Sequence, residues 1–241
     1  DSTEPFSGKD WCGEMKREPW ERYYIVSEEH KSFISPEKSN LFALQHAKGM
    51  YENQRHTTEE KRVVNLTRSG YSGSQKYGAI LWSGDIEATW KTMKAQITEG
   101  LQMGLSGYPY WTLDIGAFFT IHENWKHRGC RANKNPNMIW FWNGDYEEGV
   151  DDLGYREIYT RWLEFGTFLP IFRSHGTDTP REIWNFGEPG TMFYDAIAKF
   201  IKLRYRLMPY IYSMAADVHY ENGTMMRSLL FDFAKDREAR K

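Results

Sequence analysis

Residues 79–85 read Ala-Ile-Leu-Trp-Ser-Gly-Asp, so four apolar residues, a two-residue turn and a carboxylate follow one another. A short apolar run closed by turn residues predicts a strand that is buried on both faces, as in parallel sheets. Apolar residues then recur at helical spacing over residues 90–101. We therefore expect a helix that ends at Gly104 and Gly107, because glycine commonly terminates helices.

The same alternation of strand and helix continues on both sides of this unit. Apolar runs predict further strands at residues 63–67, 108–113 and 170–173. Helical signals mark residues 35–57, residues 158–168 and a long segment from residue 193 that should bend or end near Pro209. Alternating strands and helices indicate an α/β fold with a parallel sheet.

Polar residues follow the carboxyl end of each predicted strand. They are Arg68, Asp85, Asp114, Arg173 and His175. In a (β/α)8 barrel this end of the strands is the active-site face, and a doubly wound sheet also binds its ligands at the carboxyl ends. The local pattern is compatible with both architectures.

The composition limits the classes of function open to this chain. Its 241 residues carry a net charge of −2, which gives no reason to expect nucleic acid or an anionic membrane as a partner. Aromatic residues make up 16% of the chain and mildly favour a carbohydrate site, because their rings stack on sugars. The two cysteines, Cys12 and Cys130, form no metal quartet, so we expect neither a metal nor a cofactor. Nothing in the sequence indicates a compartment.

The residues alone leave two interpretations for each candidate. Asp85 is either a general acid and base or the N-cap of the helix that follows, and Asp114 shares this ambiguity. A carboxylate at Asp114 could bind sugar hydroxyls through charge-assisted hydrogen bonds. Arg173 and His175 either bind the sugar as well or form a structural ion-pair node.

Five stretches of the chain read as motifs. Residues 82–85 read Trp-Ser-Gly-Asp and residues 110–116 read Tyr-Trp-Thr-Leu-Asp-Ile-Gly, and the others are residues 68–77, 161–175 and 203–210. In this order they resemble glycoside hydrolase family 31, over about residues 60–231. The first of them resembles the acid/base motif of that family.

The resemblance implies a role for each candidate residue. Asp85 would be the acid/base, and Asp1, followed three residues later by Glu4, matches the spacing of the nucleophile motif. Glu4 would orient the nucleophile. The sugar subsite would be lined by Arg68, Trp82, Asp114, Phe118, Arg173 and His175.

The resemblance also implies a domain layout. The predicted strands would be the fifth to eighth of a (β/α)8 TIM barrel, with Asp1 at the end of the fourth. We expect residues 1–222 to form the C-terminal half of this barrel and residues 223–241 to begin a β-sandwich domain. Residues 117–152 would form an insertion loop at the active-site face, where Trp140 and Trp142 either add to an aromatic acceptor subsite or pack inward as a local core. The missing half of the barrel is expected from the same parent polypeptide, and residues 1–241 alone should be inactive.

The implied activity is that of a retaining, exo-acting α-glycoside hydrolase. Such an enzyme would release a terminal α-linked glucosyl or xylosyl residue from an oligosaccharide or another α-glycoside, with two carboxylates acting in a double displacement. Two alternatives stay open: an α-transglycosylase that uses the same residues, and a non-catalytic carbohydrate-binding relative. Ile86 stands where many α-glucosidases of the family have Asn, which leaves the choice of glucoside or xyloside open.

Overall fold

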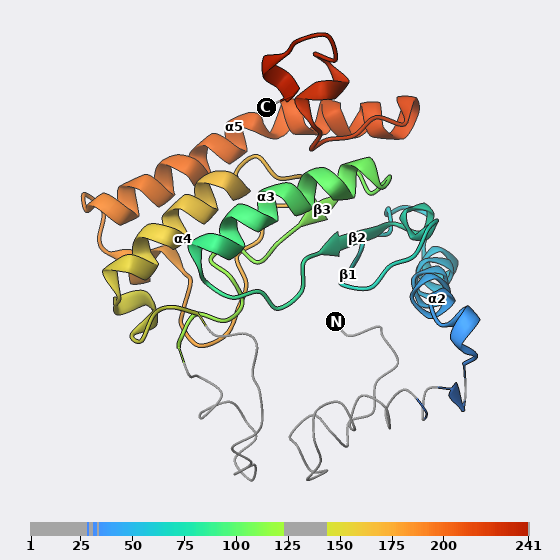
Figure 1. Ribbon diagram of the computed structural model, residues 1–241, viewed down its shortest axis with the longest axis horizontal. Helices are drawn as coiled ribbons and strands as arrows, with labels where there is room; N and C mark the ends of the chain where they lie inside the picture. Colours follow the sequence, from blue (N-terminus) through green and yellow to red (C-terminus); the bar gives the residue numbers. More distant parts are fainter. Residues whose placement is uncertain (1–27, 29–30, 33, 123–143, 241) are drawn as a thin grey trace. The chain divides into compact units, whose positions relative to one another are not determined.

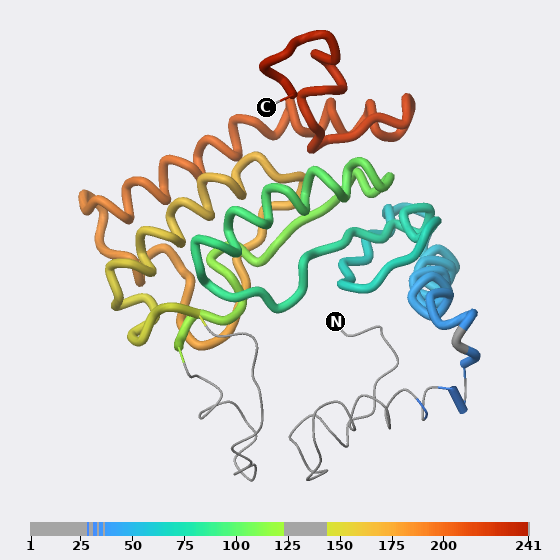
Figure 2. Tube along the Cα trace, in the orientation of Figure 1, coloured from blue at the N-terminus to red at the C-terminus, as the bar shows by residue number. Residues whose placement is uncertain are grey.

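The computed structural model describes residue 28 and residues 31–32, 34–122 and 144–240. Outside this part lie Asp1, Glu4, Cys12 and Cys130, together with Trp125, Trp140, Phe141 and Trp142 of the expected insertion loop. The chain divides into two compact units, Asp1–Leu81 with Glu123–Asn143 and Trp82–His122 with Gly144–Lys241 (Figure 1 and Figure 2).

The first unit joins one long helix to a pair of parallel strands. Its elements are η2 (Pro36–Lys38), α2 (Leu41–Thr57), β1 (Asn65–Thr67), η3 (Ser74–Tyr77) and β2 (Ala79–Trp82), whose last residue opens the second unit. Asn65 pairs with Ala79 and Thr67 with Leu81 in the parallel register. α2 packs on β1 and on η3.

The strand expected at residues 79–82 is confirmed, and all four of its residues are buried. The strand expected at residues 63–67 is shorter and begins at Asn65. Val64 is 63% exposed, so the apolar pair that suggested an earlier start does not enter the core. At Asn65 the backbone N–H donates to the Gly78 carbonyl at 2.8 Å, which starts the ladder.

The second unit is mainly helical. Its elements are α3 (Trp90–Leu105), β3 (Trp111–Thr112), η5 (Gly149–Asp151), α4 (Leu153–Gly166), η6 (Ile183–Phe186), α5 (Met192–Glu221), η7 (Leu229–Phe231) and η8 (Glu238–Arg240). α3 packs on β3, and α4 packs on α5 (Figure 1). Among the helices of the described residues, none has both the length and the apolar character that a membrane crossing requires.

Large aromatic side chains fill the core of the second unit. Trp111, Tyr155, Tyr159, Trp162 and Phe186 are all fully buried. Tyr159 and Phe186 stack with their ring centroids 4.3 Å apart, which ties α4 to η6. Much of the aromatic content that suggested a carbohydrate site is therefore packing material in this unit.

The strand expected at residues 170–173 is wrong as an element. This segment contributes one parallel bridge, between Ile115 and Ser174, beside a hydrogen bond from the Ile115 N–H to the Arg173 carbonyl at 3.2 Å. Pro170 has no N–H to donate. Its carbonyl instead accepts from Nη2 of Arg204 at 2.8 Å, so a side chain of α5 satisfies the backbone where a strand ladder was expected.

The ends of several helices also differ from expectation, and α2 begins at Leu41, after the 3-10 helix η2, rather than at residue 35. Gly104 lies inside α3, which ends at Leu105 ahead of Gly107 with φ 81°. α4 begins before the expected residue 158, because the Asp152 carboxylate caps it by accepting from the Gly154 N–H at 2.7 Å.

α5 runs through Pro209 rather than ending there. The missing proline N–H removes one hydrogen bond, and Figure 1 shows the helix changing direction along its course. It ends at Glu221, and its C-cap Asn222 has the left-handed conformation with φ 55°.

Residues 225–231 lie in the segment 223–241 that is expected to begin a β-sandwich domain, and they contain the 3-10 helix η7 rather than a strand. The boundary between residues 222 and 223 stays a prediction.

Gly104 allows α3 to approach the Met226 backbone. A Cβ at this position would lie 2.4 Å from the Met226 carbonyl oxygen. We expect Gly104→Ala to destabilise the protein by about 1–3 kcal/mol, the usual cost of overpacking. The matched control is Gly49→Ala in α2, where a Cβ meets nothing among the described residues within 4 Å and alanine gains about 1 kcal/mol of helix propensity. Chemical denaturation measures the stability of both variants. If Gly104→Ala were more stable than Gly49→Ala, the close approach of α3 to the Met226 backbone would not require glycine at position 104.

Candidate active site

Asp85 follows β2 through a tight turn. Gly84, with φ 75°, provides the left-handed conformation, and Asp85 itself is half-buried. The N-cap of α3 is Thr89, whose Oγ1 accepts from the Thr92 N–H at 3.0 Å. The structural alternative for Asp85, that it caps this helix, is therefore wrong.

A buried ion pair connects the ends of the segments that carry Asp114 and Arg173. The Asp114 side chain is fully buried, and its Oδ1 accepts from Nη2 of Arg173. Its other oxygen, Oδ2, is buried with no hydrogen-bond partner among the residues that the structure describes. The Arg173 guanidinium lies 5.5 Å from the centroid of the Trp82 ring, a cation–π arrangement. An unsatisfied buried carboxylate oxygen is suited to accept a hydrogen bond from a ligand hydroxyl.

The environment of Asp114 raises its pKa from 3.8 to about 7. Burial is the largest cause, and the charge of Asp85 acts in the same direction, while Arg173 and Arg181 oppose it. Because Asp85 contributes to this shift, the two carboxylates lie within each other's field. The attraction of Arg173 is smaller than the cost of removing the Asp114 carboxylate from water.

The raised pKa of Asp114 predicts a pH-dependent stability. The folded state holds the proton more tightly than the unfolded state, so this contribution is complete below about pH 4 and is lost as the pH rises through about 7. The Asp114→Asn variant has no titratable group at this position. We expect the free energy of unfolding of the wild type, relative to Asp114→Asn, to fall between pH 4 and pH 8. A constant difference in denaturation experiments across that range would contradict the raised pKa.

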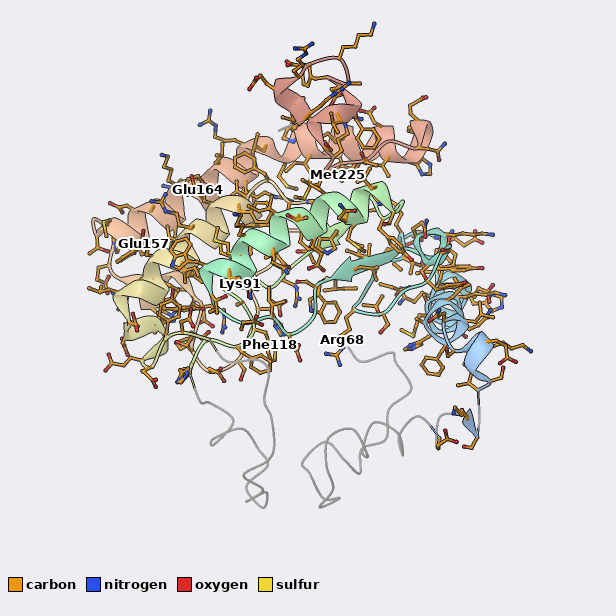
Figure 3. The ribbon with its side chains drawn as sticks, in the orientation of Figure 1. Arg68, Lys91, Phe118, Glu157, Glu164 and Met225 are labelled. Atoms are coloured by element: carbon orange, nitrogen blue, oxygen red, sulfur yellow. The ribbon has the colours of Figure 1, made fainter. Side chains whose placement is uncertain are left out.

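His175 and Phe118 form an aromatic edge next to the ion pair. Their ring centroids lie 5.6 Å apart, and Phe118 also meets Phe119 edge-on at 4.8 Å. Burial lowers the pKa of His175, and the positive charges of Arg173 and Arg181 add to this effect. The imidazole is therefore neutral at physiological pH and can both donate and accept a hydrogen bond. Phe118 lies on the loop that leaves β3, as Figure 3 shows.

The second unit thus brings together most of the residues expected from the sequence. Trp82, Asp85, Asp114, Phe118, Arg173 and His175 all belong to it, and ring contacts, an ion pair and charge interactions connect them into one site. Arg68 belongs to the first unit, where it directly follows β1 and is half-buried (Figure 3). Asp1 and Glu4 lie outside the described residues, so their roles stay predictions.

The two ends of the expected insertion loop are held near Asp85. Ile121 pairs with Tyr146 in a parallel bridge, and the Asp145 N–H donates to the Ala88 carbonyl at 3.2 Å. Ala88 belongs to the turn between Asp85 and α3. The described residues at both ends of the loop therefore lie close to the candidate acid, Asp85.

Sequence reasoning missed Arg181, Tyr155 and Tyr159. Tyr159 Oη lies 3.0 Å from Ser174 Oγ and donates to the Arg181 carbonyl at 3.0 Å, while Tyr155 Oη donates to the Gly116 carbonyl at 3.1 Å. These residues fasten the two loops of the site to α4. The predicted helix at residues 158–168 contained Tyr159 but not Tyr155, and nothing in the sequence distinguished either tyrosine from an ordinary core residue.

Comparison with known proteins shows the family to which this chain belongs. The family model for the glycosyl hydrolases family 31 TIM-barrel domain matches residues 1–214. An α-xylosidase of Saccharolobus solfataricus is 40% identical over 82% of this chain and 23% of its own length. Alpha-xylosidase A of Aspergillus niger is 32% identical over 81% of this chain and 25% of its own length.

Among solved structures, the family 31 α-xylosidase of Xanthomonas citri is similar, with a TM-score of 0.69 and 38% identity. The alignment covers 83% of this chain and 20% of that chain. The fold and the site define the class of protein as a parallel α/β domain with an acidic site at its strand ends. This chain belongs to glycoside hydrolase family 31 and has the TIM-barrel fold of that family. It spans about a quarter of the length of the curated relatives it matches.

Proposed function

We propose that this protein is a retaining, exo-acting α-glycosidase that releases a terminal α-linked xylosyl residue. The observation that carries the proposal is the buried Asp114 carboxylate, which Arg173 holds by one oxygen while the other has no partner in the described part of the chain. That arrangement, beside Asp85 and an aromatic edge, suits a sugar with several hydroxyl groups. Two relatives at 40% and 32% identity are α-xylosidases, which favours xylose over glucose.

Each site residue has a role in this proposal. Asp85 protonates the departing oxygen and later takes a proton from water, while Asp1 attacks the anomeric carbon to form a covalent glycosyl-enzyme. Asp114 accepts from a sugar hydroxyl. The assignment of Asp1 rests on the spacing of Asp1 and Glu4 and on the family to which the chain belongs.

The remaining binding residues surround the sugar in the same proposal. Trp82 and Phe118 supply apolar ring surface, and Arg173 and His175 supply donors. Arg68 donates to a sugar hydroxyl from the end of β1, and Glu4 orients the nucleophile.

The proposal places this chain within the catalytic barrel. β1 to β3 and the segment at residues 170–174 occupy the places of the fifth to eighth strands, residues 1–222 form the C-terminal half, and residues 223–241 begin a β-sandwich domain. The coverage of about a quarter of each curated relative supports the idea that the rest of the barrel belongs to the same polypeptide. A barrel needs all eight strands to close.

The test is turnover of aryl α-xyloside and aryl α-glucoside by the complete protein. We expect a higher kcat/KM for the xyloside, and incubation with a fluorinated xylosyl donor should add one sugar mass to a peptide that contains Asp1. A higher kcat/KM for the glucoside would redirect the substrate assignment. Absence of turnover on both substrates would overturn the proposed activity.

A further inference from the structure

Arg181 holds the loop that carries Phe118 by three hydrogen bonds. Its Nη2 donates to the carbonyls of Ala117 and Phe118 at 2.6 and 3.2 Å and to Oγ1 of Thr120 at 3.0 Å. Ala117 is 64 residues away in the sequence. Ala117 also has a left-handed backbone with φ 64°, which is uncommon for a residue other than glycine. The guanidinium thus stabilises a turn in which Ala117 has a backbone conformation that alanine does not favour.

The same guanidinium holds the loop that follows His175. Nη1 of Arg181 donates to the carbonyls of Thr177 and Thr179 at 3.0 and 2.7 Å. Oγ1 of Thr179 in turn accepts from the Val150 N–H at 2.7 Å, at the far end of the expected insertion loop. One side chain therefore connects three segments that surround the site.

The loop held by Arg181 also holds the backbone that follows Asp85. The N–H groups of Phe118 and Phe119 both donate to the Ile86 carbonyl at 2.9 Å, and the Ala88 N–H donates to the Phe119 carbonyl at 2.8 Å. A movement of the loop is therefore transmitted to the residues directly after Asp85. A catalytic carboxyl must keep its position within about 0.5 Å.

We propose that Arg181 is a positioning residue, which fixes Phe118 and His175 and, through the backbone of residues 117–120, the segment that follows Asp85. The proposal rests on the glycosidase function given above. Arginine suits this role because its planar guanidinium presents several donors in fixed directions, whereas lysine offers a single ammonium group. The positive charge has a second effect, since it helps to keep His175 neutral.

The test compares Arg181→Met and Arg181→Lys with Arg161→Met in the complete protein. Arg161 lies exposed on α4 and pairs with Glu164 at 3.4 Å, so its replacement controls for the loss of an arginine from the same unit. Misplacement by about 1 Å typically costs on the order of 10²-fold in rate, and we expect a loss of that size in kcat/KM for Arg181→Met. The loss should be larger for substrates with poor leaving groups, which depend on the proton from Asp85. Arg181→Lys should restore little of it.

Hydrogen exchange provides a readout that does not depend on activity. The amides of Phe118, Phe119 and Ala88 should exchange about tenfold or more faster than in the wild type in both Arg181 variants. Their exchange rates should be unchanged in Arg161→Met. Should Arg181→Met fail to fold, Arg181→Lys carries the same measurements.

Each result decides between the two proposals. Unchanged exchange at these amides overturns the positioning role, and so does faster exchange with wild-type kcat/KM and an unchanged dependence on the leaving group. A wild type that turns over neither aryl glycoside overturns the proposed function instead, and exchange alone then shows whether Arg181 holds the loops.

Discussion

Replacing Asp85 by alanine should reduce turnover of glycosides with poor leaving groups by about 10²–10⁴-fold, the usual contribution of a general acid. Aryl substrates with good leaving groups should lose much less, because their departing oxygen needs little protonation. The expected signature is a steep dependence of kcat/KM on the leaving-group pKa that the wild type lacks. Steady-state kinetics on a series of substituted aryl α-xylosides measures it.

The matched control for Asp85 is Asp152. Asp152 is a helix cap, since it accepts from the Gly154 N–H at 2.7 Å, and capping was the rival interpretation of Asp85. Asp152→Ala should cost about 1 kcal/mol of stability and leave the dependence on the leaving group unchanged. If Asp85→Ala lost activity equally on every substrate, Asp85 would not be the acid.

Replacing Arg173 by methionine should have the largest effect on stability. The change leaves the Asp114 carboxylate buried without its cationic partner, and breaking a buried pair typically costs about 3–5 kcal/mol. The Asp114 side chain is 0% exposed and that of Arg173 is 24% exposed, so water can replace little of the interaction. The same variant should raise KM, because Asp114 no longer keeps its position for the sugar.

The loss in Arg173→Met should also depend on pH. Arg173 lowers the pKa of Asp114, so its removal moves that pKa further above about 7. At pH 5 the carboxyl is protonated with or without Arg173 and the loss is smaller, whereas at pH 8 the pair is charged in the wild type and the loss is larger.

Denaturation at the two pH values compares Arg173→Met with Arg161→Met, which breaks the exposed pair with Glu164 and should cost no more than about 1 kcal/mol. Equal losses in the two variants would mean that the buried pair contributes no more than a surface pair.

The local sequence was sufficient for β2 and for the placement of Asp85. Four apolar residues in succession are typical of a strand buried on both faces, and the Ser-Gly turn after them places Asp85 just past the strand end. Asp114 and His175 were likewise identified from their places after apolar runs, whereas Phe118 came from the resemblance to family 31, and the structure brings all three together with Trp82 and Arg173.

Tertiary structure alone decided how the site is held. The segment at residues 170–173 has the composition of a strand. Its Pro170 carbonyl nevertheless accepts a hydrogen bond from Arg204 of α5, 34 residues away, and not from the backbone of a neighbouring strand. Thr89 rather than Asp85 caps α3, because the turn after Asp85 extends to Ala88 to meet the Phe119 carbonyl.

Arg181 had no periodic signal, since its acceptors lie in loops, and those at residues 117–120 are up to 64 residues away. Periodicity reports which side chains are buried near their own neighbours in sequence. It contains no information on which distant backbone groups a long polar side chain will reach, and those contacts position the catalytic and binding residues proposed for this member of family 31.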